Sequence, residues 1–110
     1  MRRGDVYTAA TGGGYGGKPR PVVLIQADLF PTAKRLVALI GSPVAGMEAV
    51  RVHIEPDGIN GLTATSEVAV DTLLTVRPHQ FGRQIGRLSD DDMRRVDRAL
   101  VVFLGLDGSR

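Results

Sequence analysis

A glycine-rich segment that runs straight into an apolar segment constrains this chain more than any other stretch. Residues 12–26 read GGGYGGKPRPVVLIQ. Glycine loses much backbone freedom on ordering, so residues 12–17 favour a loop, whereas the β-branched run at 22–25 is typical of a buried strand. Lys18 and Arg20 each precede a proline, which favours extended backbone. The segment predicts a loop hinged to a strand, with two cations at the junction, an arrangement that suits an anionic ligand.

Composition narrows the class of protein. The chain has 110 residues, 43% of them hydrophobic and 24% charged, which predicts one soluble domain spanning residues 1–110. The absence of cysteine excludes disulfides, thiol nucleophiles and cysteine metal sites. His53 and His79 are the only imidazoles, so a metal site would need several carboxylates. We therefore expect neither a cofactor nor a metal.

The sequence also predicts where the protein resides and what kind of ligand it binds. No apolar run approaches the roughly 18 residues of a membrane span, and the N-terminus lacks a signal-peptide core, so we expect a cytoplasmic protein with no membrane partner. The net charge is +2 and the isoelectric point about 9.5. Residues 1–55 hold seven Lys/Arg and four acids, a balance of +3, and the remainder holds seven and eight, a balance of −1. This bias fits a nucleic-acid or phosphate ligand.

Apolar patterning predicts a mainly β protein. Strands are expected at residues 3–8, 20–26, 36–40, 50–56, 67–77 and 81–88. The run at 36–40 is apolar on both faces and predicts a central strand, which Pro43 helps to end. Residues 67–77 alternate over their full length, which predicts one continuous face. That face comprises Val68, Val70, Thr72, Leu74 and Val76.

The last segment predicts the one helix. Ser89 is a good N-cap, and three aspartates follow in the first turn, where the helix dipole favours negative charge. An apolar stripe of Met93, Val96, Leu100 and Phe103 should pack on the sheet, and Gly105 should end the helix. The expected fold is mainly β (α+β): a small barrel or coiled antiparallel sheet of five to seven strands with a C-terminal α-helix.

Several catalytic motifs are missing. The glycine segment lacks the G-x-x-x-x-G-K-S/T order and the following helix of a phosphate-binding loop, and the dinucleotide fingerprint fails for the same reason. No histidine pair has metal-ligand spacing, and no nucleophile elbow is present. Arginine, a small hydroxyl and backbone amides remain, and this set suits RNA cleavage by the 2′-hydroxyl of the RNA itself.

Two residues are the first candidates for that chemistry. Arg20 at a strand start and Ser42 at a strand end could face one phosphate, because the guanidinium fork fits phosphate oxygens and keeps its charge. The residues alone leave two plainer interpretations open. Arg20 would then be a surface or salt-bridged arginine, and Ser42 a turn hydroxyl bonded to nearby backbone.

The chain resembles the MazF/PemK family of toxins over nearly its whole length. The resemblance rests on RGDVY at residues 3–7, GKPRPVVLIQ at 17–26, NGL at 60–62, VAVD at 68–71, GRQIGRL at 82–88 and VDRAL at 96–100. It implies an SH3-like barrel and a homodimer that is neutralised by a cognate antitoxin. It also implies metal-independent cleavage of single-stranded RNA at specific sequences, which leaves a 2′,3′-cyclic phosphate and a 5′-hydroxyl.

The resemblance also assigns catalytic residues. The family's catalytic arginine falls on Arg20, and Gly41 stands where relatives have a threonine, with Ser42 beside it. Ser42 could supply the hydroxyl through a small backbone shift, the Gly41 amide could replace it, or catalysis could be weak; we favour Ser42. Asp71 and Thr72 match an acid–amide pair near the RNA, so Thr72 could contact a base, and Asp71 could either lie at the RNA site or form a structural ion pair.

The glycine segment matches a loop that shapes the family's RNA groove. We expect Tyr15, Gly16, Gly17, Lys18 and Gly41 to bind RNA, with Lys18 attracting phosphate and Tyr15 either stacking on a base or contacting a protein partner. A CcdB-like toxin that poisons DNA gyrase is the alternative on the same fold. The C-terminal residues 106–110 lack the aromatic anchor that such a toxin would use. A catalytically inactive binding module is the third hypothesis, because Gly41 stands where relatives have a threonine.

Overall fold

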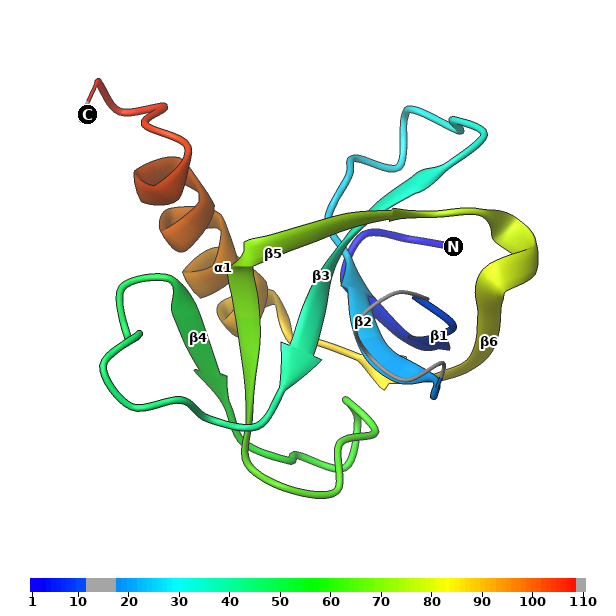
Figure 1. Cartoon of the computed structure of the whole chain (residues 1–110), viewed down its shortest axis with the longest axis horizontal. Helices are drawn as coiled ribbons and strands as arrows, with labels where there is room; N and C mark the ends of the chain where they lie inside the picture. Colours follow the sequence, from blue (N-terminus) through cyan, green and yellow to red (C-terminus); the bar gives the residue numbers. More distant parts are fainter. Residues whose placement is uncertain (12–17, 109–110) are drawn as a thin grey trace.

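The computed structural model describes residues 1–11 and 18–108 as one antiparallel sheet with a helix packed against it (Figure 1). The sheet order is β4-β5-β3-β2-β1-β6, and every pairing is antiparallel. The elements are β1 (Asp5–Ala9), β2 (Arg20–Leu24), β3 (Arg35–Gly41), β4 (Arg51–Ile54), β5 (Ser66–Val76), the 3₁₀ turn η2 (Pro78–Gln80), β6 (Phe81–Arg87) and α1 (Asp90–Phe103). The predicted fold class is confirmed, with strand ends that differ from the predicted ones by at most two residues.

The sheet coils so that its two faces bury two separate apolar clusters. The larger cluster lies between the sheet and α1, and includes Val23, Ile40, Val68 and Val96. The smaller cluster lies on the opposite face, at the β1, β2 and β3 side. Because β3 sends Ala38 and Ile40 to the larger cluster and Val37 to the smaller one, it is the central strand that its two-sided apolar sequence predicts.

β5 corrects the prediction of one continuous alternating face. Val68 and Val70 pack in the larger cluster, whereas Leu74 and Val76 pack in the smaller one. The register against β3 shifts between Ala38 and Leu39, where β5 carries three extra residues. This β-bulge moves the second half of the strand to the other face. Letter-by-letter alternation persists through the bulge, so the sequence pattern could not reveal it.

The helix begins and ends where its sequence signals predict. The backbone N–H of Asp92 donates to the Ser89 hydroxyl at 3.1 Å, and Gly105 adopts a φ of 70° after the last turn. Met93 and Val96 are buried and Leu100 is partly buried against the core. Phe103 is 45% exposed, so its predicted packing on the sheet is wrong. The helix carries it past the edge of the sheet (Figure 1).

The turn at residues 57–61 is locked under β6. Asn60 is fully buried: its amide nitrogen donates to the Glu55 carbonyl at 2.9 Å, and its amide oxygen accepts from the Leu62 N–H at 3.0 Å. A Cβ on Gly86 would lie 2.3 Å from the Asn60 backbone. This close approach holds the turn at residues 57–61 against β6.

No helix within the described residues is long and apolar enough to cross a membrane.

Candidate active site at the shared end of β2 and β3

The start of β2 and the end of β3 lie side by side, and they bring the candidate catalytic residues together. Val22 pairs with Leu39 across the two strands. Continuing that antiparallel register by two residues on each strand places Arg20 opposite Gly41, with Ser42 next along the chain. Both strand ends belong to the sheet, because β2 begins at Arg20 and β3 ends at Gly41. The structure thus places the predicted arginine and the predicted hydroxyl residue at the shared end of the central strands β2 and β3.

The same row of the sheet continues into β5 and β4. Gly41 pairs with Glu67, and Glu67 pairs with His53. Directly opposed residues project on the same face of a sheet. The neighbours Ile40, Val68 and Val52 all pack in the larger cluster, so the row from Arg20 to His53 projects on the opposite face.

The Arg20 and Ser42 side chains are available to a ligand. Arg20, Gly41 and Ser42 are exposed. Among the residues that the structure describes, neither the Arg20 guanidinium nor the Ser42 hydroxyl has a hydrogen-bond or ion-pair partner. A Cβ built on Gly41 would meet no atom within 4 Å. A salt-bridged arginine and a turn hydroxyl bonded to backbone therefore find no support within the described part of the chain, whereas an ordinary surface arginine agrees with the exposure of Arg20.

The other predicted RNA contacts vary in position. Lys18 is exposed two residues before β2. Thr72 is half-buried within the β-bulge of β5, beside Ala38 and Leu39 of β3. Tyr15, Gly16 and Gly17 lie outside the described residues. Of the residues that the sequence predicts to bind or cleave RNA, the structure brings together Arg20, Gly41 and Ser42, at the shared end of β2 and β3.

Asp71 has a structural role. The Arg51 guanidinium donates to both its carboxylate oxygens, from Nε at 2.8 Å and from a terminal nitrogen at 3.2 Å. Both side chains are about one-fifth exposed. This paired geometry joins β4 to β5 and agrees with the ion pair, one of the two roles that the sequence left open for Asp71.

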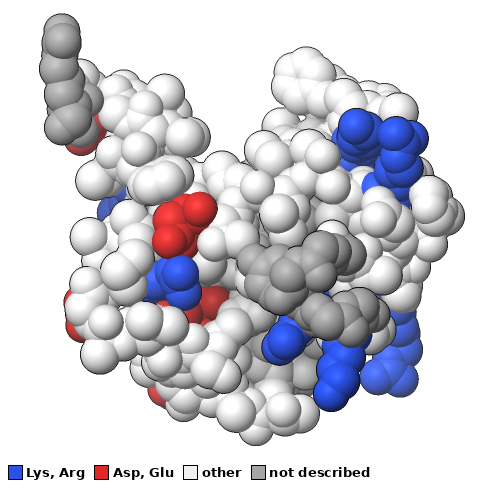
Figure 2. Space-filling view, in the orientation of Figure 1, with Lys and Arg blue, Asp and Glu red and all other residues white. Residues whose placement is uncertain are grey.

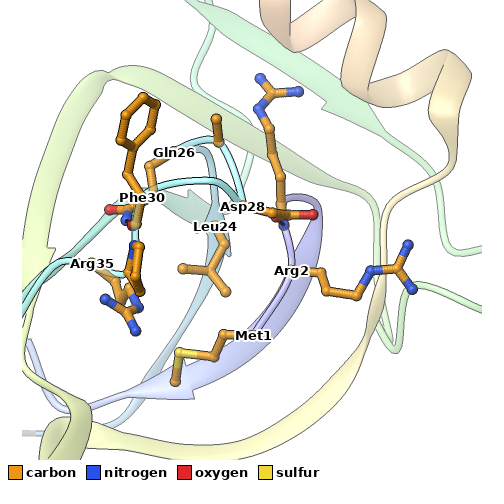
Figure 3. Close-up of a pocket in the computed structure, with 10 residues that line it drawn as sticks. Met1, Arg2, Leu24, Gln26, Asp28, Phe30 and Arg35 are labelled. Carbon is orange, nitrogen blue, oxygen red and sulfur yellow. Dashed lines mark hydrogen bonds between the residues drawn. The ribbon is translucent and has the colours of Figure 1, made fainter.

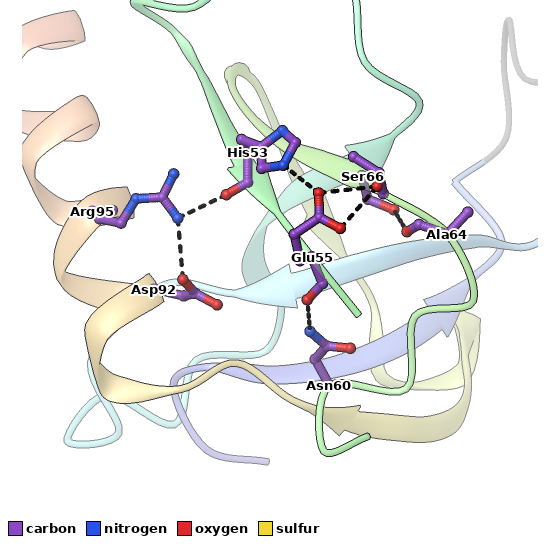
Figure 4. Close-up of polar contacts among 8 residues, drawn as sticks. His53, Glu55, Asn60, Ala64, Ser66, Asp92 and Arg95 are labelled. Atoms are coloured by element: carbon purple, nitrogen blue, oxygen red, sulfur yellow. Dashed lines mark hydrogen bonds and ion pairs between the residues drawn. The ribbon is translucent and has the colours of Figure 1, made fainter. Parts of the chain in front are cut away.

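His53 belongs to a polar network that anchors β4 (Figure 4). Its Nε2 lies 2.5 Å from Glu55 Oε1, and its carbonyl accepts from Arg95 of α1 at 2.7 Å. The Thr65 hydroxyl also donates to Glu55 at 3.0 Å. Those hydrogen bonds, from Thr65 first and then from His53, lower the pKa of the Glu55 carboxyl. The exposed histidine that the sequence predicts is confirmed, since its side chain is 55% exposed.

A groove of about 780 Å³ opens beside the row, between α1, β4 and the segment after Ser42. Its walls combine apolar residues with the side chains of Arg51, His53, Glu67, Arg95 and Arg98. Figure 2 shows acidic side chains around a Lys/Arg patch on this side of the molecule, and further separate Lys/Arg patches on the opposite side.

A second cavity, of about 70 Å³, lies at the opposite end of β2 and β3 (Figure 3). Leu24, Gln26, Phe30 and Arg35 line it. One terminal nitrogen of Arg35 is buried without a hydrogen-bond partner among the described residues. Because β2 begins at Arg20 and reaches this cavity only at its far end, the cavity is separate from the candidate active site.

The sequence patterns do not mark Glu67, a member of this row, as a site residue. Glu67 is only 7% exposed, and its Oε1 accepts the backbone N–H of Val44 at 2.9 Å. The sequence signal was an acid at the start of an alternating apolar strand. Its position opposite Gly41 depends on strand register, which the sequence does not state.

Comparison with known proteins identifies the class. Residues 2–104 match the model of the PemK-like, MazF-like toxins of type II toxin–antitoxin systems. A probable endoribonuclease MazF of Mycolicibacterium smegmatis is 45% identical over 109 residues, covering 98% of this chain and 100% of that protein. Endoribonuclease EndoA of Bacillus subtilis is 32% identical over 114 residues, covering 96% of each.

A solved structure agrees on the fold. A mycobacterial endoribonuclease, described in complex with its cognate antitoxin, superposes with a TM-score of 0.81 over 96% of each chain at 23% identity. The chain belongs to the PemK-like, MazF-like toxin family, and these comparisons identify it as an RNA-cleaving toxin. They give no support to the gyrase-poisoning alternative.

Proposed function

We propose that this chain is a single toxin domain, acting in the cytoplasm, that cleaves single-stranded RNA at specific sequences without a metal ion. The observation that supports the proposal is the register of β2 and β3, which, continued by two residues, brings Arg20 opposite Gly41 at the strand end that precedes Ser42. The named endoribonucleases to which the chain is similar support the reaction class.

In the proposed reaction the ribose 2′-oxygen attacks the adjacent phosphorus. The P–O5′ bond breaks, and the products carry a 2′,3′-cyclic phosphate and a 5′-hydroxyl. Arg20 neutralises the charge that develops on the phosphoryl oxygens, and the Ser42 hydroxyl donates a hydrogen bond to one of them. The exposure of both side chains supports this role.

RNA specificity arises from the residues around the shared end of β2 and β3. Lys18 draws the phosphate backbone toward β2, and Gly41 leaves open space over the strand end. Tyr15, Gly16, Gly17 and Thr72 complete the proposed RNA contacts, with Tyr15 stacking on a base. A cognate antitoxin inhibits the toxin by laying a segment across the strand end that carries Arg20, Gly41 and Ser42. The solved structure of a relative, described in complex with its cognate antitoxin, supports an antitoxin as the partner.

We test the reaction with a long, mixed-sequence RNA in the presence of EDTA. Wild type is expected to cut at a small set of sites, and Arg20→Ala to lose about 10²–10³-fold in rate. Arg98→Ala removes an equally charged, exposed side chain from α1 and serves as the matched control. Full activity in Arg20→Ala would refute the assignment of Arg20, and full activity in Ser42→Ala would refute that of Ser42.

The proposed homodimer has a separate line of support. Apolar side chains cluster at the C-terminal end of α1 with 36–70% exposure, namely Val101, Val102, Phe103, Leu104 and Leu106. Surfaces of this kind mark interaction sites. Light scattering is expected to give twice the 11.8 kDa chain mass, and Phe103→Lys is expected to halve it. A monomeric wild type would refute the dimer.

A further inference from the structure

The proposed cleavage requires a group that accepts the 2′-hydroxyl proton, and neither Arg20 nor Ser42 can do so near neutral pH. Arginine keeps its proton at any working pH, and a serine hydroxyl is a poor base. The acceptor must therefore come from elsewhere. Glu67 and His53 are the two titratable groups of the cross-strand row that starts at Arg20.

Glu67 is the nearer of the two to the cleavage edge. It stands directly opposite Gly41, one strand away, whereas His53 stands two strands away. The His53 ring is also held by Glu55 of its own strand at 2.5 Å. Proximity to the phosphate thus favours the carboxylate of Glu67 over the imidazole.

The spacing of the strands leaves room for a phosphodiester between the backbones of Arg20 and Glu67. The two residues flank Gly41 on β2 and β5, so two interstrand spacings of about 4.8 Å separate their backbones by about 10 Å. A side chain on Gly41 would lie between them, but glycine leaves that position open, with no atom within 4 Å of a built Cβ. A scissile phosphate above Gly41 would have a cation on one side and a carboxylate on the other.

The Glu67 carboxylate is also oriented. Its Oε1 accepts the Val44 N–H at 2.9 Å, which ties it to the segment that follows Ser42. The side chain is 7% exposed and lines the groove beside the row. Anchoring one oxygen to the backbone restricts the rotation of the carboxylate, and a general base must be held in place in this way.

We propose that Glu67 is the proton acceptor of the cleavage reaction, an inference that rests on the proposed function. The 2′-oxygen forms its bond to phosphorus while its proton passes to the Glu67 carboxylate. The P–O5′ bond breaks, and the departing 5′-oxygen takes a proton from water. Glu67 then returns its proton to solvent, so the enzyme is unchanged and the RNA products carry a cyclic phosphate and a 5′-hydroxyl.

The decisive variant is Glu67→Gln, measured in single-turnover cleavage with EDTA. The glutamine amide oxygen can still accept the Val44 N–H, so the local structure is kept while the base is lost. We expect a loss of about 10²–10⁴-fold in rate, equal within about threefold to that of Glu67→Ala. Affinity for a non-cleavable 2′-O-methyl RNA is expected to stay within threefold of wild type.

Glu48→Gln is the matched control. Glu48 is an exposed carboxylate that lines the same groove, so its substitution makes the same change in net charge. We expect it to leave the rate within threefold of wild type. Glu67→Asp keeps a carboxylate and is expected to retain more activity than Glu67→Gln. It also separates loss of the base from a folding defect, because a merely structural role would spare the glutamine variant instead.

Two results overturn the inference in distinguishable ways. Near-normal cleavage by Glu67→Gln with a severe loss in Glu67→Ala would make Glu67 a residue that only positions the segment after Ser42. The proposed function would survive that result if Arg20→Ala were inactive. A folded wild type that cuts no RNA would overturn both the proposed function and the role of Glu67.

Discussion

Two glycine positions show how differently this small protein treats its framework and its candidate active site. Gly61 has a φ of 75°, and a Cβ there would lie 2.0 Å from the Ile85 carbonyl oxygen. Gly41 needs no unusual φ, and a Cβ there would meet nothing within 4 Å. The first glycine is required by packing, whereas the second leaves open space. The contrast shows that packing constrains the turn at residues 57–61 and leaves the strand end at Gly41 open.

The largest effect is expected at the framework glycine. Gly61→Ala combines a strained left-handed backbone with a clash against β6, so it should lower the free energy of unfolding by about 4 kcal/mol. Urea denaturation measures this directly. A loss under about 1 kcal/mol would show that the turn at 57–61 can move away from Ile85.

The next largest effect is expected one residue earlier. Asn60→Ala leaves the Glu55 carbonyl and the Leu62 N–H without their buried partner, which should cost about 3 kcal/mol. Ser42→Ala is the comparison, since it removes a polar group from an exposed strand end. Thermal unfolding should separate the two variants clearly. Equal melting temperatures would contradict the contrast between the two regions.

A pH-dependent effect is expected in the same turn. Backbone N–H groups of Ile59 and Asn60 donate to Asp57 and lower the pKa of its carboxyl from the usual 3.8. The folded state therefore binds this proton less readily than the unfolded chain. The stabilisation is present above about pH 4 and is lost as the pH falls through the lowered pKa. Asp57→Asn should lower the melting temperature at pH 7 and converge toward wild type near pH 2. A constant difference across that range would refute the linkage.

The smallest effect on stability is expected at the site glycine. Gly41→Thr adds a β-branched side chain at a strand end with free space around it, so the free energy of unfolding should change by no more than about 0.5 kcal/mol. Chemical denaturation beside Gly61→Ala makes a matched pair of glycine substitutions. A loss of several kcal/mol would show that the strand end is as tightly packed as the turn.

Local signals predicted much of the fold. The two-sided apolar run of β3, the Ser89 cap and Gly105 each act over a few residues, and the structure confirms all three. The bulge in β5 and the exposure of Phe103 could not be predicted in this way. Both depend on how far one element extends past another, which is set by non-local packing.

The candidate site divides along the same line. Arg20 precedes Pro21 at a strand start, and Ser42 precedes Pro43 at a strand end. The sequence therefore predicted where both residues lie in the fold. Glu67 became visible only through the pairing of β5 with β3 and β4. A single acid in an alternating strand carries no mark of which residue faces it, because register is decided by the whole sheet. The roles of all three residues remain predictions for the experiments above.

The most direct measurement of the central claim uses an RNA with one cleavage site and a single 2′-deoxy substitution on its 5′ side. With EDTA present, the account predicts that the all-ribose RNA is cut to fragments with 5′-hydroxyl and 2′,3′-cyclic phosphate ends. The 2′-deoxy RNA should stay intact, because it lacks the nucleophile. Cutting of the 2′-deoxy RNA, or 5′-phosphate ends on the fragments, would contradict attack by the RNA's own hydroxyl beside Arg20.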